Sequence, residues 1–256
     1  MSAVNPALSR LTLWRVFART FFLQAGFSPE AMQTLGLLYS LEPALRELYS
    51  DETQRKEAVR RHLSTFNTHP YVAAGLVGGI LFHEVRVSRG EEPPDTVRRF
   101  KETLMGPLAA LGDGFFWRSL RPATGALAAA LVPLIHEWAV LVYVALYNLV
   151  HLWLRGQLFW MGWTLGDGIV GSVSAVKLPS WGDRLRTVAA ACAGALGAWL
   201  AMLFGLHVPG GWGTPLLSLG ALVLGLGTLV LVEHQVKPLW VMYGLATIAF
   251  IAGALE

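Results

Sequence analysis

Charged residues are concentrated in the first two-fifths of this 256-residue chain. Residues 1–103 carry 13 of the 20 Lys and Arg residues and 11 of the 17 Asp and Glu residues, which leaves 7 and 6 for residues 104–256. A globular domain needs roughly a quarter of its residues charged, whereas charged residues make up 14% of this chain and hydrophobic residues 54%. The split predicts a water-compatible N-terminal part followed by a part that lies mostly in a membrane.

Several classes of function are disfavoured by composition. The net charge of +3 is too small to favour a nucleic-acid partner. The seven histidines form no short metal-binding pattern with each other or with Cys192, and no phosphate-binding loop is present, so we expect no metal and no cofactor. The N-terminus lacks the pattern of a cleavable signal peptide, and we expect it to stay in the cytoplasm.

The N-terminal part is predicted to form amphipathic helices. Residues 11–23 place aromatic side chains on one helical face with Arg15 and Arg19 beside it, which suits a helix in the membrane interface or on a partner, although an ordinary core helix fits as well. Residues 30–48 should form a helix that Pro43 ends or kinks. Asp51 is a plausible N-cap of a further helix that reaches about Phe66.

Short and long apolar segments follow. The short ones, broken by Gly or Pro, are residues 70–82, 105–117 and 123–135, and the longer ones are residues 138–154, 158–176, 188–206, 216–232 and 239–255. About 20 apolar residues are needed to cross a bilayer. Lys and Arg residues mark cytoplasmic loops, so residues 177–186 and 233–238 are expected inside and residues 207–215 and the C-terminus outside. Arg155 and Lys177 on either side of residues 158–176 are both expected inside, so this segment has no crossing to make and is expected to be re-entrant or to lie on the membrane surface.

These segments predict an all-α, polytopic membrane protein with amphipathic N-terminal helices, short re-entrant or broken helices and several transmembrane helices. We divide it into a cytoplasmic or interfacial helical region (1–69), broken apolar segments with a polar loop at 87–103 (70–135) and a transmembrane region (136–256). Irregular backbone survives in a membrane only where protein or a watery cavity covers it. Transporters use such breaks to present polar groups to a substrate, although a packed structural subunit can contain them too.

Polar residues at these breaks are candidate ligands. Asn67, Thr68 and His69 lie between the charged helix and the first apolar segment, and Asp113 lies in a Gly-Asp-Gly turn. Their ordinary roles would be a helix C-cap and a helix N-cap. Amide, hydroxyl and carboxylate groups are also what the hydroxyls of a neutral sugar require. Both interpretations stay open on these residues alone.

Two long motifs stand out in the sequence, RRHLSTFNTHPYVAA at 60–74 and LMGPLAALGDGFFWRSLRP at 104–122, and shorter ones such as Val236-Lys-Pro-Leu-Trp240 follow them. Taken in this order, they resemble the IID subunits of the mannose/fructose/sorbose family of phosphotransferase (PTS) permeases. The chain departs from the family at Ala110 and Gly114, where Gly and Pro are common, and in the short stretch between His207 and Leu216. Relatives have a longer external segment there, and the short stretch in this chain puts in doubt whether this chain keeps the role of that segment.

The resemblance implies a membrane subunit that forms, with an obligate IIC subunit, the translocation unit for a hexose-type sugar in the bacterial inner membrane, as a higher oligomer of IIC–IID pairs. Cytoplasmic IIA and IIB proteins would carry the phosphate, and no phosphorylated or catalytic residue is expected here. The alternative is a non-transporting membrane partner that stabilises or regulates another permease, which the short external stretch motivates.

Within this scheme we place the sugar site on Asn67 and Thr68, with Asp113 as a third member. Seven basic residues are offered as a docking surface for the phosphorylated IIB protein, and their ordinary role would be a solvated, cytoplasmic face. They are Arg55, Lys56, Arg60, Arg61, Arg98, Arg99 and Lys101.

Overall fold

The structure is a computed structural model that describes residues 8–205 and the single residues 223, 244 and 247. The chain divides into two compact units, Met1–Ala190 and Ala191–Glu256. The segments expected at 216–232 and 239–255, and the loops expected at 207–215 and 233–238, lie outside the described residues. The three-part division made from the sequence stays a prediction.

All regular elements in the described part are helices, which agrees with the predicted all-α class, and the only β-type pairings there are isolated bridges from Met32 to Ser28 and to Phe66. In chain order the elements are α1 (Arg10–Arg19), η1 (Thr20–Phe22), α2 (Thr34–Leu48), α3 (Glu52–Arg61), α4 (Ala73–Ser88), α5 (Asp95–Gly112), the π-helix η2 (Asp113–Leu120), α6 (Arg121–Ile135), α7 (Trp138–Leu165), η3 (Gly166–Gly168), α8 (Ile169–Ala175) and α9 (Leu178–Gly205).

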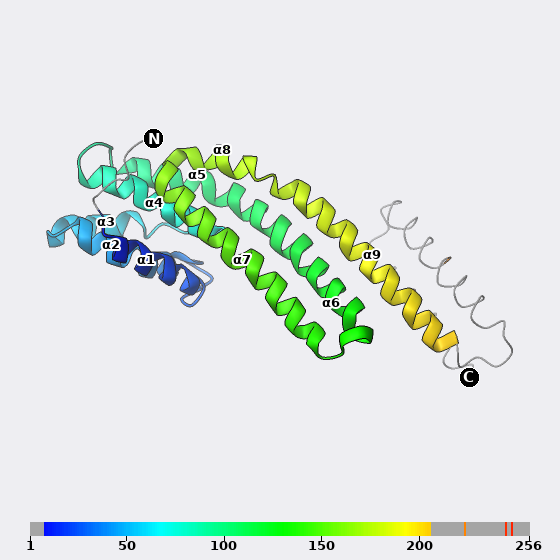
Figure 1. Cartoon of the computed structure of the whole chain (residues 1–256). Helices are drawn as coiled ribbons and strands as arrows, with labels where there is room; N and C mark the ends of the chain where they lie inside the picture. Colours follow the sequence, from blue (N-terminus) through cyan, green and yellow to red (C-terminus); the bar gives the residue numbers. More distant parts are fainter. Residues whose placement is uncertain (1–7, 206–222, 224–243, 245–246, 248–256) are drawn as a thin grey trace. The chain divides into compact units, whose positions relative to one another are not determined.

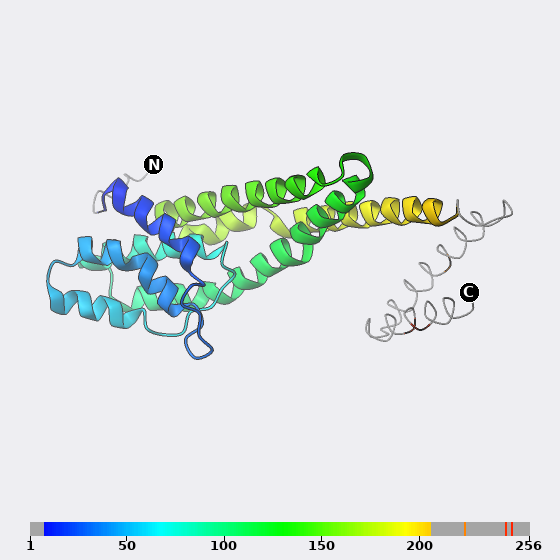
Figure 2. The same cartoon turned by 90° about the horizontal axis from the view of Figure 1, so that it is seen from below.

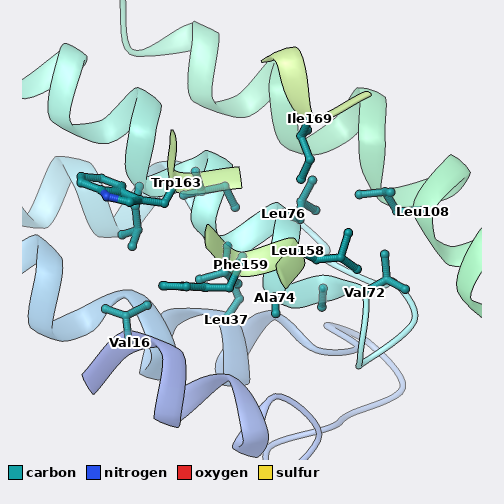
Figure 3. Close-up of a cluster of buried hydrophobic side chains, with 14 of the residues drawn as sticks. Val16, Leu37, Val72, Ala74, Leu76, Leu108, Leu158, Phe159, Trp163 and Ile169 are labelled. Carbon is teal, nitrogen blue, oxygen red and sulfur yellow. The ribbon is translucent and has the colours of Figure 1, made fainter. Parts of the chain in front are cut away.

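The first unit is built around α4. This helix is buried along most of its length, with α7, α5 and α2 packed against it. Helix α2 lies beside α4, α1 and α3 pack on α2, and α6 extends beyond them next to the first half of α7 (Figures 1 and 2). Side chains from α1, α2, α4, α5, α7 and α8 form one hydrophobic core, which includes Val16, Leu37, Leu76 and Phe159 (Figure 3).

Three glycines allow α4 and α7 to pack closely. A Cβ atom on Gly162 of α7 would lie 2.0 Å from the carbonyl oxygen of Gly75, and a Cβ atom on Gly78 of α4 would lie 2.2 Å from the carbonyl oxygen of Phe159. Real Cβ atoms do not approach an oxygen so closely, so only glycine fits at Gly78 and Gly162. Residues 73–82 of the glycine-rich segment 70–82, which was expected to be broken or re-entrant, form the first part of the regular buried helix α4.

Other predicted breaks do not end a helix. Pro43 lies inside α2, which continues to Leu48, and its missing N–H frees the carbonyl of Tyr39. That carbonyl accepts a hydrogen bond of 2.9 Å from the Arg19 guanidinium, so the proline leaves no unpaired group behind. The segments expected at 105–117 and 123–135 join into one run of helix from α5 through η2 to α6, which Pro107 does not interrupt.

Several predicted boundaries move. Asp51 is the predicted N-cap and accepts from the backbone N–H of Gln54 at 2.9 Å, but α3 ends at Arg61 and does not reach Phe66. The polar loop expected at 87–103 is shorter, because α4 ends at Ser88 and α5 begins at Asp95. Helix α7 runs through the boundary expected near residue 155, so residues 158–165 belong to a long helix, and a turn at η3 separates them from α8.

The first half of α7 exposes large apolar side chains. Within the described residues, one helical stretch in Trp138–Gly197 is long and apolar enough to cross a membrane, with a mean hydropathy of 1.4. Only 22% of its most apolar window is buried inside the chain, unlike the core helix of a soluble protein. Trp138, Leu149 and Trp153 are each more than 60% exposed. This surface suits contact with lipid or with another membrane subunit.

Candidate functional site

The segment between α3 and α4 forms a β-type pairing with Met32 and Gln33, which directly precede α2. The side-chain amide of Gln33 donates to the Thr68 carbonyl at 2.8 Å and accepts from the Thr68 N–H at 3.1 Å. The Gln33 N–H donates to the Phe66 carbonyl at 2.8 Å. In an extended segment successive side chains point to opposite sides, and here Phe66 and Thr68 are buried while Asn67 is exposed.

The π-helix η2 packs against this segment through His69. A Cβ atom on Gly112 would lie 2.4 Å from the Cβ of His69, so the end of α5 touches the histidine directly. The His69 ring stacks on Phe116 with centroids 5.0 Å apart and lies 4.9 Å from the Trp117 ring. The structure therefore brings together the two motifs at 60–74 and 104–122, which lie far apart in the sequence.

The π-helix η2 contributes one of its faces to this junction. Its hydrogen bonds span five residues, one more than in an α-helix, so side chains four and five positions apart lie above one another. Asp113 is half-buried, Trp117 is 47% exposed, and Arg118 is exposed, so these three share the open side of η2. Phe115 and Phe116 are turned inward. A π-helix is rare and is often found at functional sites.

Helix α7 supplies the other wall of the junction with a stripe of polar residues one turn apart. Tyr147, His151 and Arg155 follow one another at intervals of four residues. The Tyr147 hydroxyl donates to the Tyr71 hydroxyl at 3.4 Å, the His151 ring stacks on Tyr71 at 3.7 Å, and the Arg155 guanidinium donates to the Pro70 carbonyl at 2.8 Å.

Several buried polar atoms at this junction have no hydrogen-bond partner within the described residues. They are Thr68 Oγ1, His69 Nε2, both ring nitrogens of His151, and Nε and Nη1 of Arg155. Buried polar groups are normally paired, so the junction has unused hydrogen-bonding capacity. Burial lowers the pKa of His69 to about 4, and the nearby charge of Arg155 acts in the same direction, so this ring is neutral at physiological pH.

The predicted sugar-site residues occupy three different environments. Asn67 is exposed, Thr68 is 4% exposed with a free hydroxyl, and Asp113 is half-buried. The contact between His69 and Gly112 places their two segments side by side. Asp113 does not cap a new helix, because the backbone continues helically from α5 into η2. The N-cap interpretation of Asp113 is therefore wrong.

Sequence reasoning did not identify Trp117, His151 or Arg155 as site residues. Trp117 lies inside the second motif, and its exposure could not be read from the motif. Arg155 was used only as a marker of the cytoplasmic side. A lone arginine inside a long apolar helix is costly unless it has a partner or a function, and this was the available signal.

Two of the seven predicted docking residues have their charged groups engaged inside the fold. Arg61 donates from Nε to Glu84 Oε1 at 2.8 Å, and the buried Glu84 also binds the Tyr49 hydroxyl at 2.7 Å and His62 Nε2 at 2.9 Å. Burial raises the pKa of Glu84, but the hydrogen bond from His62 and the charge of Arg61 outweigh it, so the carboxyl is held ionised. Lys101 is fully buried and donates to Ser64.

The other five remain at the surface. Lys56 and Arg60 are exposed on α3, Arg55 is partly exposed, and Arg98 and Arg99 are exposed on α5, where both pair with Asp95. Among the described residues, no group of three or more His, Cys, Asp or Glu side chains could hold a metal ion.

Comparison with known proteins agrees with the motifs. The sequence pattern of the "PTS system mannose/fructose/sorbose family IID component" matches residues 7–208. A mannose-specific EIID component of Escherichia coli is 37% identical over 171 residues, which cover 66% of this chain and 60% of that protein. A sorbose-specific EIID component of Klebsiella pneumoniae is 29% identical and covers 94% of each chain.

Solved structures show the same relationship. A chain from a cryo-electron microscopy structure of the mannose transporter ManYZ bound to a microcin is 28% identical, with a TM-score of 0.60 and 97% of each chain covered. A second structure, described as a membrane protein, reaches a TM-score of 0.74 at the same identity and coverage. This chain therefore belongs to the IID component family of the mannose/fructose/sorbose phosphotransferase systems.

Proposed function

We propose that this chain is the IID membrane subunit of a sugar-specific phosphotransferase permease in the bacterial inner membrane. With a IIC subunit it would form the translocation unit for hexose import, coupled to phosphorylation by IIA and IIB proteins. The observation that carries the proposal is the junction between the 66–71 segment, η2 and α7. There the two family motifs meet, and buried polar atoms have no partner in the part of the chain that the structure describes.

The junction suits a neutral, hydroxyl-rich ligand. Asn67 and Asp113 offer amide and carboxylate groups, and Thr68 adds a hydroxyl that has no partner among the described residues. Sugar hydroxyls both donate and accept, so such groups can bind them without a cluster of charge. The exposed Trp117 ring provides an apolar surface beside them, against which the C–H face of a sugar ring can pack. We assign Asn67, Thr68 and Asp113 to the sugar site and add Trp117 as its aromatic wall.

Docking of the phosphorylated IIB protein is proposed for the exposed basic residues. Arg55, Lys56 and Arg60 on α3, with Arg98 and Arg99 on α5, form the docking set. Arg61 and Lys101 are excluded from it because their charged groups are engaged inside the fold. This arrangement assumes that the N-terminus lies in the cytoplasm and that IIC–IID pairs assemble into a higher oligomer.

The test is uptake of a hexose that depends on phosphoenolpyruvate in cells that lack their own permease of this family. We expect uptake only when this chain is produced together with its IIC, IIA and IIB partners. If cells with the IIC protein but without this chain take up sugar at the same rate, the chain is not part of the translocation unit. That result would favour the alternative, a subunit that stabilises or regulates another permease.

A further inference from the structure

An open groove of about 810 Å³ lies between α2 and α3, away from the sugar junction. Five cationic side chains and two carboxylates line it, an excess of three positive charges. The cations are Arg19, Arg46, Arg55, Lys56 and Arg60, and the carboxylates are Glu42 and Glu52. An excess of this size attracts an anion, and the effect is stronger where the apolar wall of a groove excludes part of the water.

The ion pairs within the groove leave some N–H donors of its basic side chains without an acceptor among the described residues. Glu42 is shared between Arg19, at 2.7 Å, and Arg46, while Glu52 pairs with Lys56 at 2.7 Å. Arg60 has no side-chain partner within the described residues. Exposed ion pairs of this kind are weak, typically below about 1 kcal/mol, so an incoming anion can replace them.

Exposed apolar side chains adjoin the basic ones. Tyr39 lines the groove and is 49% exposed, Phe22 is 56% exposed and meets the Tyr39 ring edge-on at 6.2 Å, and Leu35 lies one turn before Tyr39 on α2 and is 55% exposed. Aromatic and aliphatic side chains next to arginines are typical of surfaces at the boundary between lipid headgroups and acyl chains. A groove that only held an acidic protein segment would not need this apolar rim.

We propose that this groove binds an anionic phospholipid, with the headgroup phosphate among Arg46, Arg60 and Arg19 and the acyl chains over Phe22, Leu35 and Tyr39. Anionic lipids of a cytoplasmic leaflet attract basic residues at the membrane surface, and each Lys or Arg contributes about a fivefold gain in affinity. The inference does not depend on the sugar site. It overlaps the docking set only at Arg55, Lys56 and Arg60.

The test is lipid binding to this chain purified with its IIC partner. The delipidated complex is titrated with phosphatidylglycerol or phosphatidylcholine, and retained lipid is measured by native mass spectrometry. We expect preferential retention of phosphatidylglycerol. Arg46→Gln with Arg60→Gln should weaken its binding about 25-fold, as the product of two fivefold losses. Glu52→Gln should strengthen it, which misfolding cannot imitate.

The matched control is Arg98→Gln with Arg99→Gln, which removes the same charge from α5, outside the groove. This pair should leave phosphatidylglycerol binding unchanged. Equal retention of the two lipids, or an equal loss in both double variants, would overturn the proposal. Displacement of the lipid by millimolar inorganic phosphate would overturn it in favour of a soluble-phosphate site. If Arg46→Gln with Arg60→Gln weakened binding of the IIB protein and left lipid binding intact, the groove would be a site for a protein partner.

Discussion

The close packing of α4 against α7 makes Gly162→Ala a sharp test of the fold. The added Cβ would lie 2.0 Å from the Gly75 carbonyl oxygen and 2.8 Å from the Gly79 nitrogen. Carbon and oxygen atoms approach to about 3.3 Å at their closest favourable contacts. The two helices would therefore have to separate by about 1 Å at this point, because both obstacles are backbone atoms that cannot rotate away.

The cost follows from what the interface holds. A gap of 0.5–1 Å forfeits about a quarter to a half of the dispersion energy of the atoms that face it. Leu158, Phe159 and Trp163 of α7 are all buried beside α4 and would lose such contacts. Overpacking a well-packed core typically costs about 1–3 kcal/mol. We expect the upper end, about 3 kcal/mol, because rigid backbone lies on both sides of the new atom.

The assay is thermal unfolding of the detergent-purified complex, followed by tryptophan fluorescence. A loss of about 3 kcal/mol corresponds to a midpoint about 6–12 °C lower in a chain of this size. Gly156→Ala is the control on the same helix, because a Cβ there meets nothing within 4 Å. It should be neutral or stabilise by about 0.5–1 kcal/mol, since alanine favours helix more than glycine does. If both substitutions behave alike, α4 and α7 do not pack as described.

Three further predictions test other parts of the molecule. Glu84→Gln should cost about 3–5 kcal/mol of unfolding free energy, because it breaks a buried ion pair, whereas the exposed Glu91→Gln should change it by less than about 0.5 kcal/mol; equal melting curves would refute the Glu84 network. Burial lowers the pKa of His69 to about 4, so as the pH falls the unfolded chain protonates this histidine before the folded chain does, and the free energy of unfolding should decrease between about pH 6.5 and pH 4. If the free energy of unfolding of His69→Gln decreased as steeply over this range as that of the wild type, the assignment would be refuted. Neutralising Lys56, Arg98 and Arg99 should slow phosphorylation-coupled uptake at low ionic strength and have less effect at high salt. If uptake were unchanged at both salt levels, these residues would have no role in docking and would only form a solvated face.

The local signals in the sequence predicted some elements well. The charge split and the apolar segments indicated an all-α membrane protein, and the Asp51 cap lies where its residue type predicted. These features depend on neighbours within a few residues. The family was predicted from the resemblance of the two motifs, and the comparison confirms it over residues 7–208.

The errors arose where a distant residue decides the outcome. Pro43 does not end α2, and Arg19 from another helix satisfies the freed carbonyl of Tyr39. The glycines of α4 looked like breaks but serve close contact with α7, and only a known partner helix distinguishes the two roles. Helix propensity describes the isolated segment, and tertiary packing overrides it in both cases.

In the candidate site, too, features that depend on nearby residues were predicted, and features that depend on distant residues were not. Asn67 and Asp113 were predicted from residue type and position, and the structure brings their segments together through His69 and Gly112. The docking set stays a prediction, and it loses Arg61 and Lys101 because a run of basic residues does not reveal which of them has a buried partner. Glu84 lies 23 residues after Arg61 and could not be paired with it in advance.

The most direct test of the sugar site is the affinity of the purified IIC–IID complex for labelled mannose, fructose and sorbose, with and without Asn67→Ala. Loss of a hydrogen-bonding group from the site should cost about 1–3 kcal/mol, or about one to two decades in affinity. We predict at least tenfold weaker binding of the transported sugar, with a complex that purifies normally. Asn148→Ala, the same change at an exposed position on α7, should bind like the wild type. An intact Asn67→Ala complex with wild-type affinity would contradict the assignment and place the sugar elsewhere.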